Sequence, residues 1–294
     1  MLPDLLKPLL AIPVLIVAVP LLWRLFRGTW RELDDEALRH RRESIAREGF
    51  DSRPLVGLVI CAFVLAFIRF YGWRSTYAGV VRPFLAEWDL AHGGTLRLLK
   101  YDELWGWAWW SGMNVLGYLA PLALWKLFYP KDSILDFGLR AKGCFREMWI
   151  CGVLLAAVLP AVWLASGEPD FRTVYPMYKA SARSWFDLLL WEGMYFLQFF
   201  ALEAFFRGFG IGMLRRSFGS GAIFAMAVPY CMIHFGKPYF EAMGAILTAI
   251  ALGSLCARTR SIYPGFLMHI SVAALMDGLA LLQRNALPTS FWPP

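Results

Sequence analysis

Charged residues are scarce in this chain of 294 residues. Asp, Glu, Lys and Arg make up 17% of it, against about 25% in a typical soluble domain, whereas 59% of its residues are hydrophobic. This composition excludes a soluble globular protein and predicts an all-α fold, a polytopic bundle of membrane helices. The net charge of +7 does not indicate a nucleic-acid partner. The basic residues fall in short loops between apolar runs, where they orient a protein in the lipid bilayer.

Several site motifs are also missing. The five cysteines form no CxxC pair and four lie in apolar runs, which disfavours a disulfide framework or a zinc cluster. The chain has no HExxH motif of zinc proteases and no GxGD motif of aspartyl intramembrane proteases. The nearest match to the GxSG motif of rhomboid-type serine proteases is FGSG, whose Ser220 we expect to cap a helix start.

Apolar runs and their connections predict about eight transmembrane helices. The predicted spans are Leu5–Trp23, Pro54–Trp73, Trp105–Phe128, Trp149–Ala165 and about 184–214, 218–235, 241–257 and 261–283. The short turns between the last spans indicate antiparallel neighbours in a bundle. Residues 24–53 are expected to form a polar surface helix. We divide the chain into N-terminal helices with basic loops (1–183), a core (184–284) and a tail (285–294).

The basic residues also predict the topology. Arginines follow the first apolar run rather than preceding it, which is the reverse of a secretory signal peptide, so this run is expected to be a retained span. Loops after the odd-numbered spans hold the larger share of Lys and Arg. The positive-inside rule then places both termini outside the cytoplasm of a multi-pass cell-membrane protein.

The stretch Trp191–Arg215 carries charge inside an apolar run, at Glu192, Glu203 and Arg207. A charge at the centre of a membrane helix costs about 2.5–3.5 kcal/mol on insertion scales, so a compensating partner is expected. Glu203 and Arg207 share a helix face at i, i+4 spacing. They are either a neutralising pair that fixes helix packing, or a site in which Arg207 keeps Glu203 ionised as a general base.

Other polar residues follow in the last three spans. His234 ends one span and Glu241 begins the next, while His269 and Asp277 lie two turns apart on one face of the last span. Each could instead have a purely structural role, the histidines as hydrogen-bonding residues and the carboxylates as polar groups near the end of a span. At 1.5 Å per residue, the depths of His234, His269 and Asp277 overlap with that of Glu203, and we expect these groups to share one polar cavity.

This order of motifs resembles the CPBP family, which contains the type II CAAX prenyl endopeptidases. The family's EExxxR motif corresponds to Leu202–Arg207, followed by Gly208. Its FxxxH motif corresponds to Tyr230–His234, and its HxxxN motif to His269 with Ala273 at the Asn position. The resemblance covers about residues 185–283.

The resemblance implies peptide hydrolysis inside the membrane. Glu203 would activate water, and His234 and His269 would position it and stabilise the oxyanion. Arg207, Glu241 and Asp277 would be supporting residues. No cofactor is implied, although two His and one Glu could instead bind zinc. The implied partners are the bilayer and a membrane-associated or exported substrate protein, and the implied location is a bacterial inner membrane.

Leu202 and Ala273 depart from the family pattern, since the family uses a glutamate and an asparagine there. The chain is therefore an enzyme whose chemistry relies on Glu203, or a non-catalytic immunity or accessory protein on the same scaffold. A coherent second set of residues favours activity: a single Glu before FFRG, an HFGKPxxE turn, and an Asp eight residues after a His. A transporter is disfavoured, because the sequence shows no internal repeat.

Overall fold

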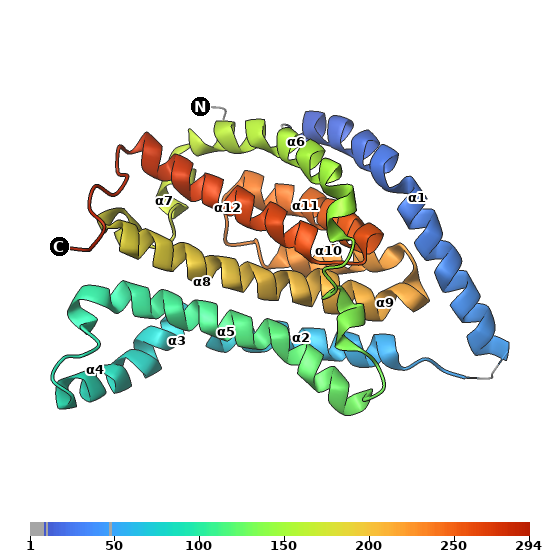
Figure 1. Cartoon of the computed structure of the whole chain (residues 1–294), viewed down its shortest axis with the longest axis horizontal. Helices are drawn as coiled ribbons and strands as arrows, with labels where there is room; N and C mark the ends of the chain where they lie inside the picture. The colour runs from blue at the N-terminus through green and yellow to red at the C-terminus, as the bar shows by residue number, and fades with distance from the viewer. Residues whose placement is uncertain (1–8, 10, 47–48) are drawn as a thin grey trace. The chain divides into compact units, whose positions relative to one another are not determined.

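The computed structural model describes residue 9 and residues 11–46 and 49–294, and the regular elements in this part of the chain are all helices (Figure 1). This confirms the all-α prediction. The α-helices are α1 (Ala11–Ala46), α2 (Arg53–Tyr71), α3 (Arg74–Thr76), α4 (Arg82–Ala91), α5 (Leu98–Phe128), α6 (Met148–Ser166), α7 (Pro169–Val174), α8 (Trp185–Glu203), α9 (Ile211–Phe218), α10 (Gly221–Met232), α11 (Tyr239–Thr259) and α12 (Tyr263–Gln283). The π-helices are η2 (Tyr77–Val81) and η6 (Ala204–Gly210), and the 3₁₀-helices are η3 (Ile134–Phe137), η4 (Cys144–Glu147) and η5 (Lys179–Arg183).

Six helical segments in the described part of the chain are long and apolar enough to cross a membrane, so the chain is a multi-pass membrane protein. They are Ile12–Ala46, Arg53–Tyr71, Cys144–Ser166, Trp185–Phe218, Tyr239–Thr259 and Tyr263–Gln283. The predicted count of eight is not confirmed. Two predicted spans are absent from this set: α10 has only 12 residues, and the tryptophans and Asn114 of α5 lower its hydropathy.

Helix α1 differs from the prediction of a short span followed by a separate surface helix. It runs without a break for 36 residues, through Pro20 and on through the Arg-rich stretch to Ala46. The first residues of the predicted span 5–23 lie outside the described part of the chain. Arg, Glu and Leu favour helix, and the stretch after Trp23 contains no proline, so nothing in its sequence ends the helix.

The start of α8 follows from local side-chain chemistry. Ser184 is the N-cap: its Oγ accepts a hydrogen bond from the backbone N–H of Asp187, and the hydroxyl donates to the Asp187 carboxylate. Arg183 pairs with the same carboxylate at 2.7 Å. This reciprocal capping fixes the helix start at Trp185, as the prediction of a span from about 184 requires.

Helix α8 ends at Glu203, and the chain continues as the π-helix η6. Single turns of π-helix inside longer helices occur frequently at functional sites. The motif Ala204–Gly210 (AFFRGFG) therefore has a backbone different from that of the α-helix expected for it.

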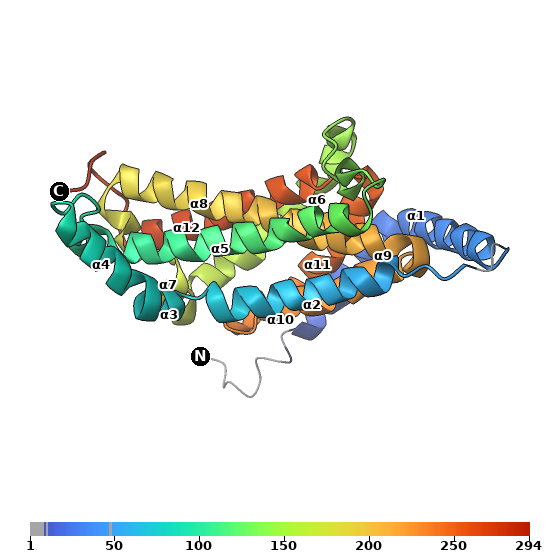
Figure 2. The ribbon, with the colours of Figure 1, turned by 90° about the horizontal axis from the view of Figure 1, so that it is seen from below.

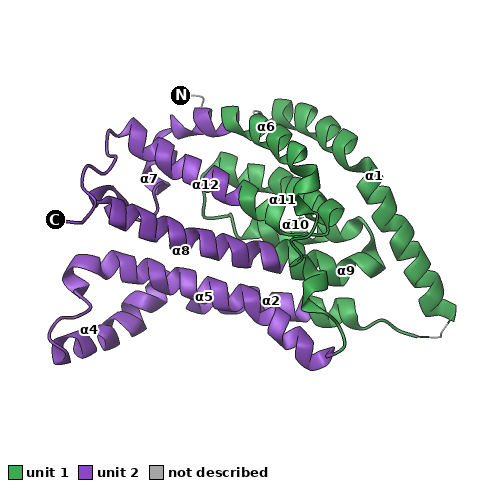
Figure 3. Ribbon diagram, viewed as in Figure 1, with its two compact units in different colours: residues 1–58, 131–160, 206–268 green, residues 59–130, 161–205, 269–294 purple. Residues whose placement is uncertain are grey.

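The chain forms two compact units (Figure 3). Unit 1 contains residues 1–58, 131–160 and 206–268, and unit 2 contains residues 59–130, 161–205 and 269–294. In unit 1, α1 packs on α9 and α11, and α10 packs on α11. The core of unit 1 is built from α1, α6, α11 and the start of α12, around Phe26, Ile150 and Leu255.

In unit 2, α5 and α8 lie side by side (Figures 1 and 2). Ser111 of α5 donates a hydrogen bond to the carbonyl of Met194 on α8 at 2.8 Å. An aromatic core cluster, built on Trp107, Tyr178, Trp191 and Tyr195, buries Ala273 of α12. This cluster brings the C-terminal part of α12 against α8.

Candidate active site

The carboxylate of Glu203 contacts the imidazole of His269. Glu203 is the last residue of α8, His269 lies in α12, and Oε1 and Nδ1 are 2.7 Å apart. The Glu203 side chain is fully buried, and the His269 side chain is 12% exposed. When Glu203 is ionised it only accepts hydrogen bonds, so Nδ1 of His269 carries the hydrogen. The charge state of His269 is then set by its other nitrogen, Nε2.

A row of aromatic rings on α8 leads to this pair. Phe199, four residues before Glu203, stacks on the His269 ring with centroids 4.7 Å apart and an interplanar angle of 17°. Tyr195 packs on Phe199 at 4.4 Å, and Trp191 stacks on Tyr195 at 4.8 Å. Residues four apart lie above one another on a helix, so these rings form one continuous face. That face holds the imidazole plane against α8.

A second polar contact joins the same two helices. Trp191 Nε1 donates to Oδ2 of Asp277 at 2.7 Å, and both side chains are buried. Glu192 also interacts with the Asp277 carboxyl group. Asp277 is therefore a buried group that bonds to α8, and not a carboxylate at an exposed span end. Ala273, between His269 and Asp277 on α12, packs in the aromatic cluster.

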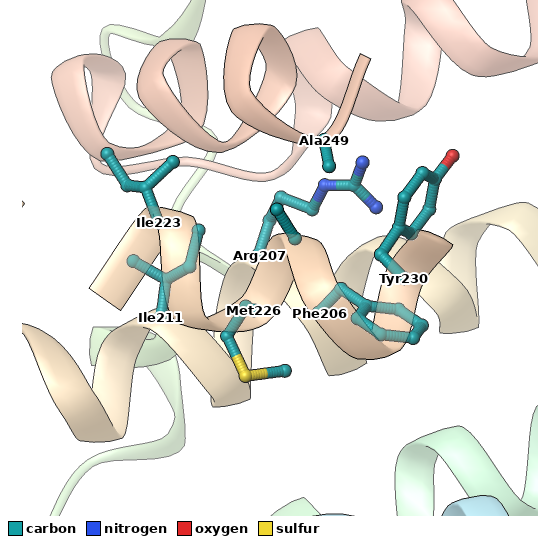
Figure 4. Close-up of a pocket in the computed structure, with 8 residues that line it drawn as sticks. Phe206, Arg207, Ile211, Ile223, Met226, Tyr230 and Ala249 are labelled. Carbon is teal, nitrogen blue, oxygen red and sulfur yellow. The ribbon is translucent and has the colours of Figure 1, made fainter. Parts of the chain in front are cut away.

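In unit 1, Tyr230 contacts two of the predicted site residues. The guanidinium carbon of Arg207 lies 4.0 Å from the centroid of the Tyr230 ring, and Arg207 is 5% exposed. Such a cation–π contact stabilises a desolvated guanidinium (Figure 4). His234 Nδ1 lies 2.8 Å from the Tyr230 carbonyl, and the two rings pack at 4.7 Å. A carbonyl only accepts, so Nδ1 of His234 carries a hydrogen, and Nε2 accepts in the neutral ring and donates in the protonated one.

A small cavity lies beside Arg207 in unit 1 (Figure 4). Its volume is about 10 Å³, close to the minimum for a single water molecule. Its lining is apolar apart from Arg207 and Tyr230, and consists of Phe206, Arg207, Ile211, Ile223, Met226, Ala227, Tyr230 and Ala249. The cavity is too small for a peptide.

Glu241 lies in the first turn of α11, and its carboxylate lies 3.7 Å from the Lys237 ammonium group. Both are partly exposed, so this ion pair belongs to the turn between α10 and α11.

Ser220 occupies the N-cap position of α10, but its side chain makes no capping hydrogen bond, so the predicted cap is wrong in that respect. Its backbone N–H instead donates to Asp34 at 2.7 Å.

The six predicted site residues thus fall into two groups. Glu203, His269 and Asp277 belong to unit 2, and Arg207, His234 and Glu241 belong to unit 1. The roles of all six, and their convergence on one cavity, stay predictions.

Within the described residues, no three His, Cys, Asp or Glu side chains are grouped as metal ligands. All five cysteines are free thiols.

The sequence reading gave no role to Phe199, Trp191 or the ring of Tyr230. It also missed Gln198, an amide on α8 that is only 3% exposed. A usable signal was present, because Phe199 precedes Glu203 by four residues and Tyr230 precedes His234 by four. An aromatic residue four positions before a polar residue lies on the same face of the helix, one turn away, so the two side chains can pack together.

Comparison with known protein families agrees with the motif reading. Residues 183–275 match the family model described as Type II CAAX prenyl endopeptidase Rce1-like. The match covers less than half of the chain, and it contains Glu203, Arg207, His234, Glu241 and His269 but not Asp277. No curated protein and no solved structure matches the chain. The predicted resemblance is confirmed for this Rce1-like segment.

Proposed function

We propose that the Rce1-like segment hydrolyses a peptide bond of a membrane-associated or exported protein, using water activated by Glu203. The observation that carries this proposal is the 2.7 Å contact between the fully buried Glu203 carboxylate and His269. A buried carboxylate inside a membrane helix is costly unless it has a partner, and such residues usually have a function. The family match of residues 183–275 supports a protease-type membrane fold.

Hydrolysis by this mechanism needs only water and the side chains. Water attacks the carbonyl carbon of the scissile bond, while Glu203 takes a proton from the water. The C–N bond of the tetrahedral intermediate then breaks, and the protonated Glu203 gives its proton to the leaving amine. The products are a new amine and a new carboxylic acid, which loses its proton to the amine or to water and becomes a carboxylate, and Glu203 returns to its ionised form.

The two histidines have separate roles in this scheme. His269 donates from Nδ1 to Glu203, which orients the carboxylate and stabilises its ionised form. His234, whose Nδ1 is held by the Tyr230 carbonyl, donates from Nε2 to the oxyanion when its ring is protonated. A preorganised donor to an oxyanion typically contributes about 10²–10³-fold in rate. As the motif implies, Arg207 would be the positive charge that keeps Glu203 ionised, and its guanidinium packs on the Tyr230 ring.

The polar contacts at Asp277 and Glu241 support these groups without taking part in the chemistry. Asp277 ties α12 to α8 through Trp191, and that fixes the register in which His269 meets Glu203. Glu241 pairs with Lys237 and closes the turn that carries His234. No metal is required in this mechanism.

One observation favours the second candidate, a non-catalytic immunity or accessory protein. Leu202 and Ala273 stand where the family motifs have polar residues, and both are buried at 4% and 5% exposure. These positions contribute apolar packing here. If the protein is non-catalytic, the polar residues only stabilise the fold. A Glu203→Gln protein should then function normally.

We place the protein in a bacterial inner membrane, with the bilayer and a substrate protein as its partners. The test compares new protein N-termini in membrane and secreted fractions of cells that make the wild type or Glu203→Gln. Glu168→Gln, the same change at an exposed position, is the matched control. N-termini present with wild type and Glu168→Gln but absent with Glu203→Gln support hydrolysis. Identical sets in all three, at equal protein abundance, support the non-catalytic alternative.

A further inference from the structure

Helix α1 has two opposite faces in unit 1. Its buried face packs on α9 and α11 and consists of Leu22, Phe26, Thr29, Leu33 and Ala37. Its outward face carries five exposed arginines, Arg24, Arg27, Arg31, Arg39 and Arg42. At 3.6 residues per turn, Arg24, Arg31 and Arg42 point in nearly the same direction, and the other two lie within one residue's rotation on either side. We call these five residues the arginine stripe.

Three of the five acidic residues of α1 contact residues outside the helix. Arg260 pairs with Glu36 and lies 3.7 Å from Glu32, and Asp34 accepts the backbone N–H of Ser220. At 3.6 residues per turn, Glu32 and Glu36 lie on one flank of the stripe and Asp34 on the other. Asp35 lies within the stripe, and Glu43 is exposed on the same flank as Glu32. In the part of the chain that the structure describes, none of the five arginines makes an ion pair or side-chain hydrogen bond.

The length of α1 places the stripe at the membrane surface. The helix has 36 residues, which is about 54 Å at 1.5 Å per residue, whereas the hydrocarbon core is about 30 Å thick. Its apolar part ends at the exposed Trp23, and tryptophan collects at membrane interfaces. About 24 Å of the helix must therefore extend beyond the core, and the cost of burying arginine in a membrane favours a boundary near Arg24, with the stripe in or beside the headgroup layer. Leu38 and Ile45 are exposed on the stripe side, at 52% and 69%.

We propose that the arginine stripe of α1 binds the headgroups of anionic phospholipids. Guanidinium groups match phosphate oxygens in a planar, bidentate arrangement, and basic residues near a membrane surface are attracted by its negative potential. Leu38 and Ile45 then enter the boundary between headgroups and acyl chains, as apolar residues of interfacial helices do. Lipid binding supplies the counter-charge that the fold does not provide.

The test uses the full chain, purified in detergent micelles that contain equal amounts of phosphatidylglycerol and phosphatidylcholine. Native mass spectrometry measures which lipid remains bound. The test variant carries Arg24→Gln, Arg27→Gln, Arg31→Gln and Arg42→Gln. The matched control carries Lys131→Gln, Lys142→Gln, Arg146→Gln and Arg216→Gln, which removes the same charge from exposed residues elsewhere in unit 1. Thermal unfolding checks that both variants are folded.

The wild type and the control are expected to retain several-fold more phosphatidylglycerol than phosphatidylcholine. The stripe variant is expected to retain the two lipids about equally. Added salt should reduce the wild-type preference, because screening weakens exposed electrostatic contacts. A folded stripe variant that keeps the wild-type preference would overturn the proposal. So would an equal loss in the control, since the preference would then follow net charge and not the stripe.

Discussion

Glu203 and His269 are separated by 66 residues of sequence, and their side chains meet at 2.7 Å between α8 and α12. One is fully buried, and the other is stacked on Phe199. The contact compensates the burial of a carboxylate and gives the imidazole a defined tautomer.

Replacing Phe199 by Leu should slow cleavage by about tenfold while leaving the protein folded, because an aromatic stack of this kind contributes about 0.5–1.5 kcal/mol to holding a ring in place. The rate at which bound substrate is cleaved should fall, and the affinity for the substrate should not change. Phe63→Leu, at a position 68% exposed in unit 2, is the control. Equal rates for Phe199→Leu and Phe63→Leu would show that the stack does not position His269.

Trp191→Phe keeps an aromatic ring but removes the indole N–H that bonds to Asp277, together with part of the buried ring. Leaving the buried Asp277 oxygen without this donor costs about 1–3 kcal/mol, so this variant should lose at least that much stability in denaturant unfolding. Trp163→Phe is the matched control, since Trp163 is 64% exposed. If both variants unfold at the same denaturant concentration, the contact at Asp277 does not tie α12 to α8.

Gly208→Ala should destabilise unit 1, because an added Cβ would lie 2.5 Å from the carbonyl oxygen of Phe137. Overpacking of this kind costs about 1–3 kcal/mol, and a backbone oxygen cannot rotate away. Gly244→Ala, where a Cβ meets no atom within 4 Å, should be neutral or stabilising. The comparison is read from the thermal midpoints of the purified proteins. A Gly208→Ala protein as stable as Gly244→Ala would contradict the close approach of η6 to Phe137.

Removing metal ions should leave cleavage unchanged, because the proposed mechanism takes its base and its oxyanion donor from side chains. The measurement is the cleavage rate after dialysis against an excess of chelator, with and without added zinc. Loss of the activity on chelation and its return with zinc would instead assign Glu203 and the histidines as metal ligands.

The sequence predicted the class of fold and singled out Glu203 and His269, but it paired Glu203 with Arg207 and did not predict the contact with His269. Glu203 and His269 were identifiable because ionisable residues in apolar runs need compensation. The stacking of Phe199 and the bond from Trp191 were not, since aromatic residues are common in membrane helices and their partners depend on which helices pack together. Composition cannot distinguish a lipid-facing tryptophan from one that donates to a buried carboxylate.

The lengths of the helices were harder to predict. The arginines after Trp23 predict the end of a membrane span, but charged residues do not end a helix, so α1 continues to Ala46. The sequence also predicts a span at Trp105–Phe128, although the tryptophans and Asn114 of α5 lower the hydropathy of that helix. The π-helix at Ala204–Gly210 left no signal in the sequence beyond the two glycines of the motif, of which Gly208 closely approaches the carbonyl oxygen of Phe137.

The most direct test of the account is the rate at which purified protein in lipid vesicles cleaves a substrate identified from the N-terminus comparison. The wild type, Glu203→Gln and Glu168→Gln are compared at equal folded amounts, in water enriched with heavy oxygen. The account predicts that wild type and Glu168→Gln incorporate one heavy oxygen into the new carboxylate. Glu203→Gln should be slower by about 10²–10⁴-fold, the usual contribution of a general base. Cleavage by Glu203→Gln at the wild-type rate would contradict the assignment of Glu203 as the residue that activates water.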